Sequence, residues 1–178
     1  MPDFDVTQRF TALYDTYHRQ VYAYAVSRAG RQVADEVVSD TFMVAWRRGA
    51  DLPDPVLPWL FGVARNLLRE QARANRTRQS LADELHAWSS PEQETGADPA
   101  DLVAERSAVL TALAGLSDED RELLTLVAWH GLTPAQASVV IGCSTATYFV
   151  RLHRARKRLE RALDDSATLV LPRKDFAR

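Results

Sequence analysis

The stretch from Thr133 to Leu163 constrains the fold more than any other part of the chain, because it predicts two helices around a tight turn. A short apolar helix is broken at Gly142, which readily adopts the positive φ of a helix stop. Ser144 or Thr145 can then cap a second helix. Residues 141–163 carry six Lys or Arg against one acid. A helix-turn-helix whose second helix is this basic is typical of a segment that lies in a DNA groove.

Charge is segregated along the chain, and the net charge of −2 hides this. Residues 60–79 hold five Arg and one acid, whereas residues 82–106 hold seven acids and one Arg. The two basic blocks are therefore more informative than the total charge. The single Cys excludes an internal disulfide framework and fits a reducing cytosol. No segment has the composition of a signal peptide or a membrane span.

Apolar residues recur at helical spacing through nearly the whole chain, so we expect an all-α fold of two small helical domains. A loop with three prolines at residues 49–58 divides the second helix from a basic third helix. Ser117 followed by three acids predicts a capped helix in the second domain. The expected division is a first domain at 1–79, an acidic linker at 80–104, a helix-turn-helix domain at 105–165 and a loose tail at 166–178.

Three segments resemble the extracytoplasmic-function (ECF) sigma factors of bacteria, the small promoter-recognition subunits of RNA polymerase. They are ADEVVSDTFMVAW (34–46), PWLFGVARNLLREQAR (58–73) and LVAWHGLTPAQASVVIGCSTATYFVRLHRARKRL (126–159). With the first helix, the resemblance covers about residues 5–164. It implies that the first segment grips the clamp helices of the polymerase, the second melts and reads the −10 element, and the third reads the −35 element.

Candidate residues for the first two roles follow from the resemblance. The candidates for binding core polymerase are Asp35, Glu36, Ser39, Asp40 and Phe42. The candidates for the −10 element are Asp51, Leu52, Asp54, Val56, Trp59, Arg65, Asn66, Arg69 and Arg73. The loop residues would hold one flipped base, and the basic residues would follow the separated strand. An ordinary connecting loop, core packing of Trp59 and a purely solubilising acidic face are the competing interpretations.

The second helix of the helix-turn-helix supplies the candidates for the −35 element. Thr145, Thr147, Phe149 and Val150 would face base edges, and Arg151, His153, Arg154 and Arg158 would contact phosphates or guanines. Family members usually have Glu at Gln136, Ala at Ser138, and Gly-Thr-Val followed by a basic residue where Ala146-Thr147-Tyr148-Phe149 stands here. Phe cannot make the bidentate contact that Arg makes to guanine. We therefore expect unusual −35 specificity, or weak reliance on that element.

These features predict a sigma factor that binds core RNA polymerase and promoter DNA in the cytoplasm, as a monomer when free. We expect no cofactor, no metal and no enzymatic activity of its own. In the family an anti-sigma factor often masks the polymerase-binding surfaces, but the sequence identifies no such partner. A stand-alone helix-turn-helix regulator is one alternative, although it has no need of the WLFGVARN block. A non-DNA adaptor is another, and the two segregated Arg blocks argue against it.

Overall fold

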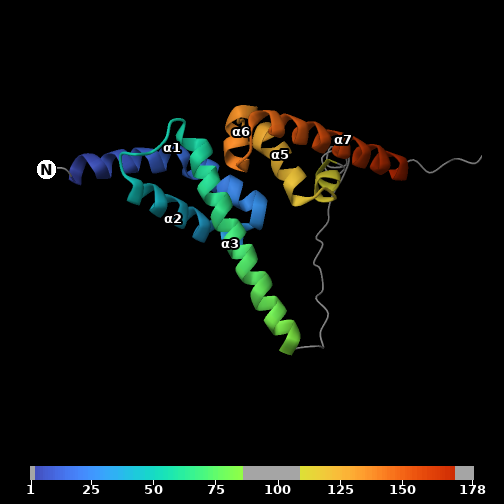
Figure 1. Ribbon diagram of the computed structural model, residues 1–178, viewed down its shortest axis with the longest axis horizontal. Helices are drawn as coiled ribbons and strands as arrows, with labels where there is room; N and C mark the ends of the chain where they lie inside the picture. Colours follow the sequence, from blue (N-terminus) through green and yellow to red (C-terminus); the bar gives the residue numbers. More distant parts are fainter. Residues whose placement is uncertain (1–2, 86–108, 171–178) are drawn as a thin grey trace, which may run out of the picture.

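The computed structural model of the chain describes residues 3–85 and 109–170, which form helices joined by short loops, without a strand in these ranges (Figure 1). The N-terminal helices are α1 (Asp3–Ala29), α2 (Arg31–Arg48) and α3 (Val56–Leu85). The C-terminal helices are α5 (Asp118–Ala128), α6 (Pro134–Ile141) and α7 (Thr145–Val170), and residues 109–114 are also helical. The expected all-α fold is confirmed over these ranges.

The first three helices form an N-terminal unit around a shared core. Gly30 alone separates α1 from α2, and its φ of 77° is a positive value that glycine adopts readily, which lets the chain turn there. Val21, Val37 and Leu60 are fully buried, one from each of the three helices. Burying a side chain of this size contributes about 1.5–3 kcal/mol. Apolar packing between the three helices therefore holds this unit together.

The last three helices form a C-terminal unit whose first helix begins as the sequence predicts. Ser117 accepts a hydrogen bond from the backbone N–H of Asp120 at 3.2 Å. The acids in the first turn of α5 also suit the positive end of the helix dipole. Leu126, Ala137 and Ala155 are fully buried, one from each helix. The predicted cap at Ser117 is confirmed.

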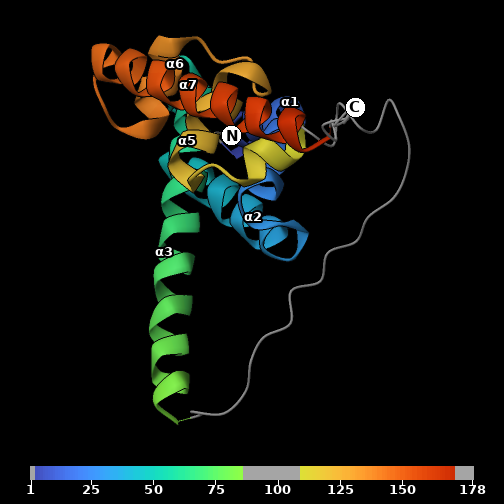
Figure 2. The same ribbon diagram turned by 90° about the vertical axis from the view of Figure 1, so that its right-hand side faces the viewer.

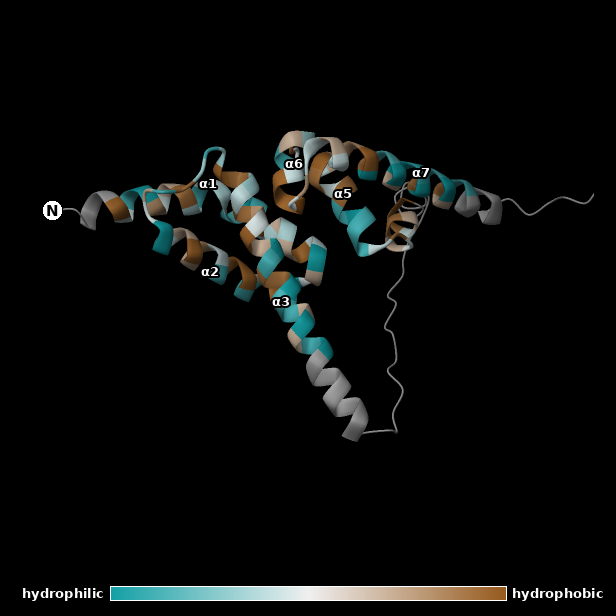
Figure 3. Ribbon diagram, in the orientation of Figure 1, coloured by the Kyte–Doolittle hydropathy of each residue, from teal (hydrophilic) through white to brown (hydrophobic). Residues whose placement is uncertain are grey.

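The two units lie in direct contact, which the sequence did not predict. α3 packs against α6, and the buried side chains of both units form one continuous cluster. Figure 2 shows the C-terminal unit beside the first half of α3, while the second half of α3 extends away from the body. In Figure 3 hydrophobic residues gather where the helices meet, and α3 becomes hydrophilic as it leaves them.

Two helices run further than the sequence analysis placed them. α3 continues to Leu85, past residue 79, and α7 continues to Val170, past residue 165 where a loose tail was expected. Neither extension contains Gly or Pro, so nothing in it interrupts the helical backbone. The rest of the predicted linker and tail lies outside the described residues.

Candidate polymerase and nucleic-acid interface

The turn between α6 and α7 has the cap geometry that its sequence predicts. Thr133 Oγ1 accepts from the Gln136 N–H at 3.2 Å, and Gln136 Oε1 accepts from the Thr133 N–H at 2.9 Å. Gly142 ends α6 in the left-handed conformation, with φ of 75°. Ser144 Oγ then accepts from the Thr147 N–H at 3.1 Å and begins α7. Gln136 thus completes a capping box as the more usual Glu would.

Ser138, the other departure from the family pattern in α6, contributes a contact between the two helices of the motif. It is buried, and its hydroxyl donates to the carbonyl oxygen of Ala135 at 2.7 Å. The hydroxyl oxygen of Ser138 also lies 3.3 Å from Thr145 Oγ1 at the start of α7. A buried hydroxyl with these partners is satisfied, so Ser is accommodated where Ala is usual.

α7 has a buried stripe and an exposed face. Tyr148, Leu152 and Ala155 are buried, and the Tyr148 hydroxyl donates to the carbonyl oxygen of Leu123 at 2.7 Å. Tyr148, one of the residues that depart from the family pattern, is therefore a core residue and not part of the exposed face of α7. Seven candidates for the −35 element are exposed: Thr145, Thr147, Phe149, Val150, His153, Arg154 and Arg158. Phe149 and Val150 are each more than half exposed.

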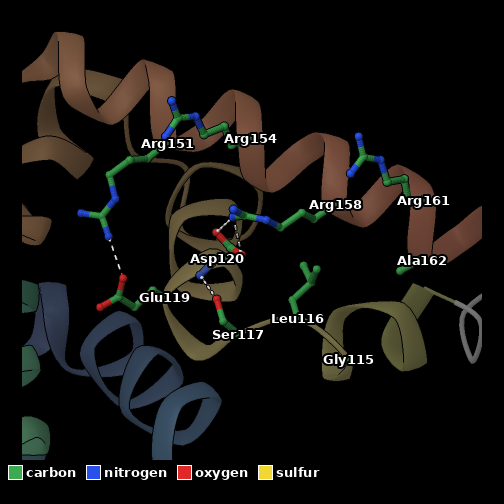
Figure 4. A pocket seen from close by; sticks show the side chains of 10 residues that line it. All are labelled: Gly115, Leu116, Ser117, Glu119, Asp120, Arg151, Arg154, Arg158, Arg161 and Ala162. Atoms are coloured by element: carbon green, nitrogen blue, oxygen red, sulfur yellow. Dashed lines mark hydrogen bonds and ion pairs between the residues drawn. The ribbon is translucent and has the colours of Figure 1, made fainter.

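Two of the −35 candidates, Arg151 and Arg158, form ion pairs with the start of α5 (Figure 4). Arg151 Nη2 lies 2.9 Å from Glu119 Oε2, and Arg158 Nη1 lies 2.8 Å from both carboxylate oxygens of Asp120. These acids and arginines line an open hollow of about 670 Å³, together with Arg154, Arg161 and neighbouring uncharged residues. The sequence predicted only that these acids stabilise the start of a helix, and it did not predict their contact with the basic helix α7.

The candidate residues in the loop before α3 and at the start of this helix differ in burial. Trp59 is half-buried, and the Arg48 guanidinium lies 5.3 Å from the centre of its ring. A cation over an aromatic face at this distance is favourable by about 0.5–1 kcal/mol. Asp51 and Asp54 are exposed, whereas Leu52 and Val56 are half-buried against the core. Each of the two apolar residues thus packs partly against the core, and the two acids face solvent.

The basic residues of α3 recur at helical spacing but differ in burial. Asn66, Arg69 and Arg73 are exposed, as expected of side chains that follow a strand. Arg65 is buried, with only 7% of its surface exposed, and its Nε donates to Glu122 Oε1 at 2.9 Å. The sequence placed Arg65 on the same solvent-facing track, and this placement is wrong. The reason is the contact between the two units, which covers this side of α3 at Arg65 and leaves it exposed at Arg69 and Arg73.

On α2 the four polar candidates are exposed: Asp35, Glu36, Ser39 and Asp40. Phe42 is buried, with ring centres 4.8 Å from Tyr14 and 6.4 Å from Phe10. Its ring thus packs between α1 and α2 and does not form part of the outer surface. The exposed apolar residues of this helix are Met43 and Trp46, which the sequence analysis did not select.

The contact between the units is centred on the carboxylate of Glu122, which is 2% exposed. It accepts a hydrogen bond from the Tyr24 hydroxyl at 2.6 Å as well as the one from Arg65, and Arg28 Nη2 lies 3.8 Å away. We call the contacting residues the interdomain clasp. They are Tyr24, Arg28, Phe61 and Arg65 from the N-terminal unit, and Glu122, His130 and Ile141 from the C-terminal unit.

Two groups in the interdomain clasp have shifted pKa values. Burial, with the neighbouring Glu122 carboxylate, raises the pKa of Tyr24 well above its ordinary value, so the hydroxyl stays protonated as a donor. Burial lowers the pKa of His130, whose ring stands edge-on to Tyr24 and Phe61 at 5.6 and 5.2 Å between centres. The buried His130 Nε2 has no hydrogen-bond partner. Neutral histidine is therefore the form that this contact favours.

Two family models match the two units. The model of sigma-70 region 2 matches residues 13–78, and the model of sigma-70 region 4 matches residues 106–159. Region 2 followed by region 4 defines a sigma factor, a DNA-binding initiation factor that directs promoter-specific transcription by RNA polymerase. A stand-alone helix-turn-helix regulator would not explain the match to region 2.

Similar curated proteins narrow this class. The chain is 31% identical over 158 residues to the ECF RNA polymerase sigma factor SigL of Mycobacterium tuberculosis, covering 86% of this chain and 88% of SigL. It is 30% identical over 150 residues to the ECF sigma factor SigM of Bacillus subtilis, covering 83% and 91%. The chain belongs to the ECF RNA polymerase sigma factors. Its partners are accordingly core RNA polymerase and promoter DNA.

Solved structures of sigma factors share the fold. The sigma factor RpoE of Bartonella quintana, in complex with the anti-sigma factor NepR, matches with a TM-score of 0.67 and 26% identity over 88% of this chain and 98% of RpoE. CnrH in complex with the cytosolic domain of CnrY matches with a TM-score of 0.62 and 25% identity, covering 89% of this chain and 90% of CnrH.

Across residues 3–85 and 109–170, no helix is suited to crossing a membrane. In the same ranges no cluster of His, Cys, Asp or Glu is arranged to hold a metal ion.

Proposed function

We propose that the exposed face of α7 reads the −35 element and that α3, with the loop before it, opens and reads the −10 element. The division of α7 into a buried stripe and an exposed face carries the first assignment. A helix of this kind after a tight turn has the geometry that enters a major groove. Phe149 and Val150 would contact thymine methyl groups, and His153 and Arg154 would reach phosphates or base edges.

The −35 assignment is tested by Arg154→Ala. Each phosphate contact contributes about −0.9 to the slope of log affinity against log salt concentration. We therefore expect weaker promoter binding and a shallower slope by about that amount. Arg19→Ala is the matched control, because it removes the same charge from an exposed position on α1. Equal slopes for the two variants across a salt series would contradict the assignment.

The −10 assignment rests on the exposed Asn66, Arg69 and Arg73 and on the loop at residues 49–57. Single-stranded DNA is bound by cationic tracks and by pockets that hold unstacked bases. Exchange of this loop for that of another ECF sigma factor should change the preferred −10 sequence in transcription assays. An unchanged preference after the exchange would assign the loop a connecting role only.

The acidic face of α2 is the surface that we assign to core polymerase. Asp35, Glu36 and Asp40 are exposed there and suit a basic partner surface. Asp40→Arg should prevent assembly with core polymerase, whereas Asp15→Arg, an equal charge change at an exposed position on α1, should not. Phe42 supports this face from inside, since its ring is in the core. Normal assembly of the Asp40 variant would refute the assignment.

We further assign the protein to the cytoplasm, where polymerase and chromosome meet, with no catalytic activity of its own. An anti-sigma factor is a proposed third partner, because RpoE, which shares the fold, is bound to one in its solved structure. Affinity purification from a native host under non-inducing conditions should recover such a protein. Recovery of polymerase subunits alone would argue against it.

A further inference from the structure

The interdomain clasp buries a charge that neither unit could bury alone. The Glu122 carboxylate belongs to α5, but the side chains that bind it, Tyr24, Arg28 and Arg65, belong to α1 and α3. A buried carboxylate is costly unless it is paired and hydrogen-bonded. These three donors therefore stabilise the contact between the C-terminal unit and the N-terminal unit.

Contacts around Glu122 extend the clasp. Arg28 Nη1 donates to the carbonyl oxygen of Asp118 at 2.9 Å, and Arg65 Nη1 donates to that of Ile141 at 3.4 Å. The Ile141 carbonyl lies at the end of α6, immediately before the turn of the helix-turn-helix. One arginine of the helix assigned to the −10 element thus touches both α5 and α6.

This closed arrangement is incompatible with binding both promoter elements. The −35 and −10 elements lie about 25 base pairs apart, which is about 85 Å at 3.4 Å for each base pair. In the closed form the helices assigned to them belong to units that are in contact through α3 and α6. Residues 86–108 can span at most about 80 Å when fully extended, so the covalent connection permits the units to separate by a comparable distance.

We propose that the interdomain clasp holds the free sigma factor closed, and that Arg65 exchanges the Glu122 carboxylate for a DNA phosphate when the molecule opens. The second part rests on the proposed role of α3 at the −10 element. Both partners are anionic oxygens, which the guanidinium binds in the same way. Opening therefore exposes one more cation on the strand-binding helix at the moment when that helix is needed.

Opening is measured on the full chain without polymerase or DNA, which separates this test from the proposed function. Fluorescent labels are placed at Ala23 of α1 and Ala146 of α7, both exposed, in a Cys143→Ser background. Glu122→Gln keeps the size of the side chain and removes its charge. We expect the open fraction to rise by at least about tenfold, the order of effect of a hydrogen bond to a charged group. Glu119→Gln removes the same charge from an exposed site on α5 and should stay closed.

A distance distribution for Glu122→Gln that matches the Glu119→Gln control, with helix content retained, would overturn the clasp. Should Glu122→Gln lose helix content, Tyr24→Phe decides in its place, because it removes one hydroxyl and preserves the ring. Opening in Tyr24→Phe supports the clasp, and a wild-type distribution in that variant overturns it.

The exchange of partners by Arg65 is tested in the opened background. Arg65→Ala added to Glu122→Gln should reduce promoter opening with core polymerase by about tenfold, as loss of a charged hydrogen bond predicts. Full promoter opening by the double variant would show that Arg65 acts only as a latch, and would overturn the exchange while leaving the clasp in place. If the −10 assignment itself fails, Arg69→Ala should open the promoter as well as the wild type does. That result would leave the interdomain distances, and therefore the test of the clasp, unchanged.

Discussion

Tyr148→Phe removes one hydrogen bond from the core of the C-terminal unit and leaves the packing of the ring in place. The lost bond is the 2.7 Å contact from the hydroxyl to the Leu123 carbonyl oxygen, made by a fully buried side chain. A hydrogen bond of this kind contributes about 0.5–1.5 kcal/mol net. In a unit of 60–100 residues, 1 kcal/mol corresponds to about 4–8 °C in Tm. We expect a loss of that order in thermal unfolding followed by circular dichroism.

The same variant should bind promoter DNA normally at a temperature where it is folded, because the buried ring cannot reach a base. Phe149→Ala is the matched comparison, since this neighbouring side chain is 54% exposed. It should leave the Tm nearly unchanged and alter affinity for the −35 element in fluorescence anisotropy. A Tyr148→Phe variant with wild-type Tm and altered promoter affinity would refute the inward placement of Tyr148.

The pH dependence gives a second check on Tyr148. Burial raises its pKa to about 12, whereas an unfolded Tyr ionises near its ordinary value of 10. The stabilisation from the neutral hydroxyl is therefore complete below pH 10 and is lost as the pH rises from 10 towards 12. The difference in stability between wild type and Tyr148→Phe should narrow over that range. A constant difference would indicate that the hydroxyl is not buried.

Three further outcomes are expected. Gly142→Ala should lower the free energy of unfolding by about 1 kcal/mol, because the φ of this residue is 75°. Gly62→Ala should raise it by up to about 1 kcal/mol, because no atom lies within 4 Å of the added Cβ. Shifts of Tm in the same direction for the two variants would contradict this expectation. Below about pH 6.5 the closed form should become less stable relative to the open form. Burial lowers the pKa of His130 in the closed form, so the open form, in which the units are separated, protonates this side chain more readily. His130→Phe should abolish this pH dependence in the distance assay. Asp120→Asn should free Arg158 and steepen the salt dependence of promoter binding by about 0.9, and an unchanged slope would exclude a phosphate contact by Arg158.

Signals that act over a few residues predicted much of the C-terminal unit. Ser117, Thr133 and Gly142 each determine a helix end through atoms within one turn of the chain, so their roles could be predicted without knowing the tertiary fold. The inward position of Tyr148 was also predictable. Together with Leu152 and Ala155 it follows the spacing of a buried helix face, and that periodicity should outweigh a comparison with residues usual at the position.

The interdomain clasp could not be predicted in this way, because its partners are far apart in the chain. Glu122 lies 57 residues from Arg65 and 98 residues from Tyr24. Periodicity identifies which face of a helix is buried but not which other helix covers it. One signal was available: Glu122 and Leu126 are four residues apart, so the acid stands on a core-facing side of α5. An acid at such a position requires a buried cationic or hydroxyl partner.

The projecting half of α3 is a helix without a covering neighbour along residues 69–76. From residue 69 to residue 76 every side chain except Gln71 is exposed, so this stretch is stabilised mainly by its own backbone. A helical backbone without tertiary packing is stabilised only weakly in water, so contacts along its surface change its stability measurably. Arg69, Arg73 and Arg76 recur at helical spacing, so this face presents cations to an anionic partner. A polyanion lying along that face would bridge successive turns and stabilise the helix beneath it, so amide exchange in this stretch should slow in proportion to the occupancy of the strand-binding track.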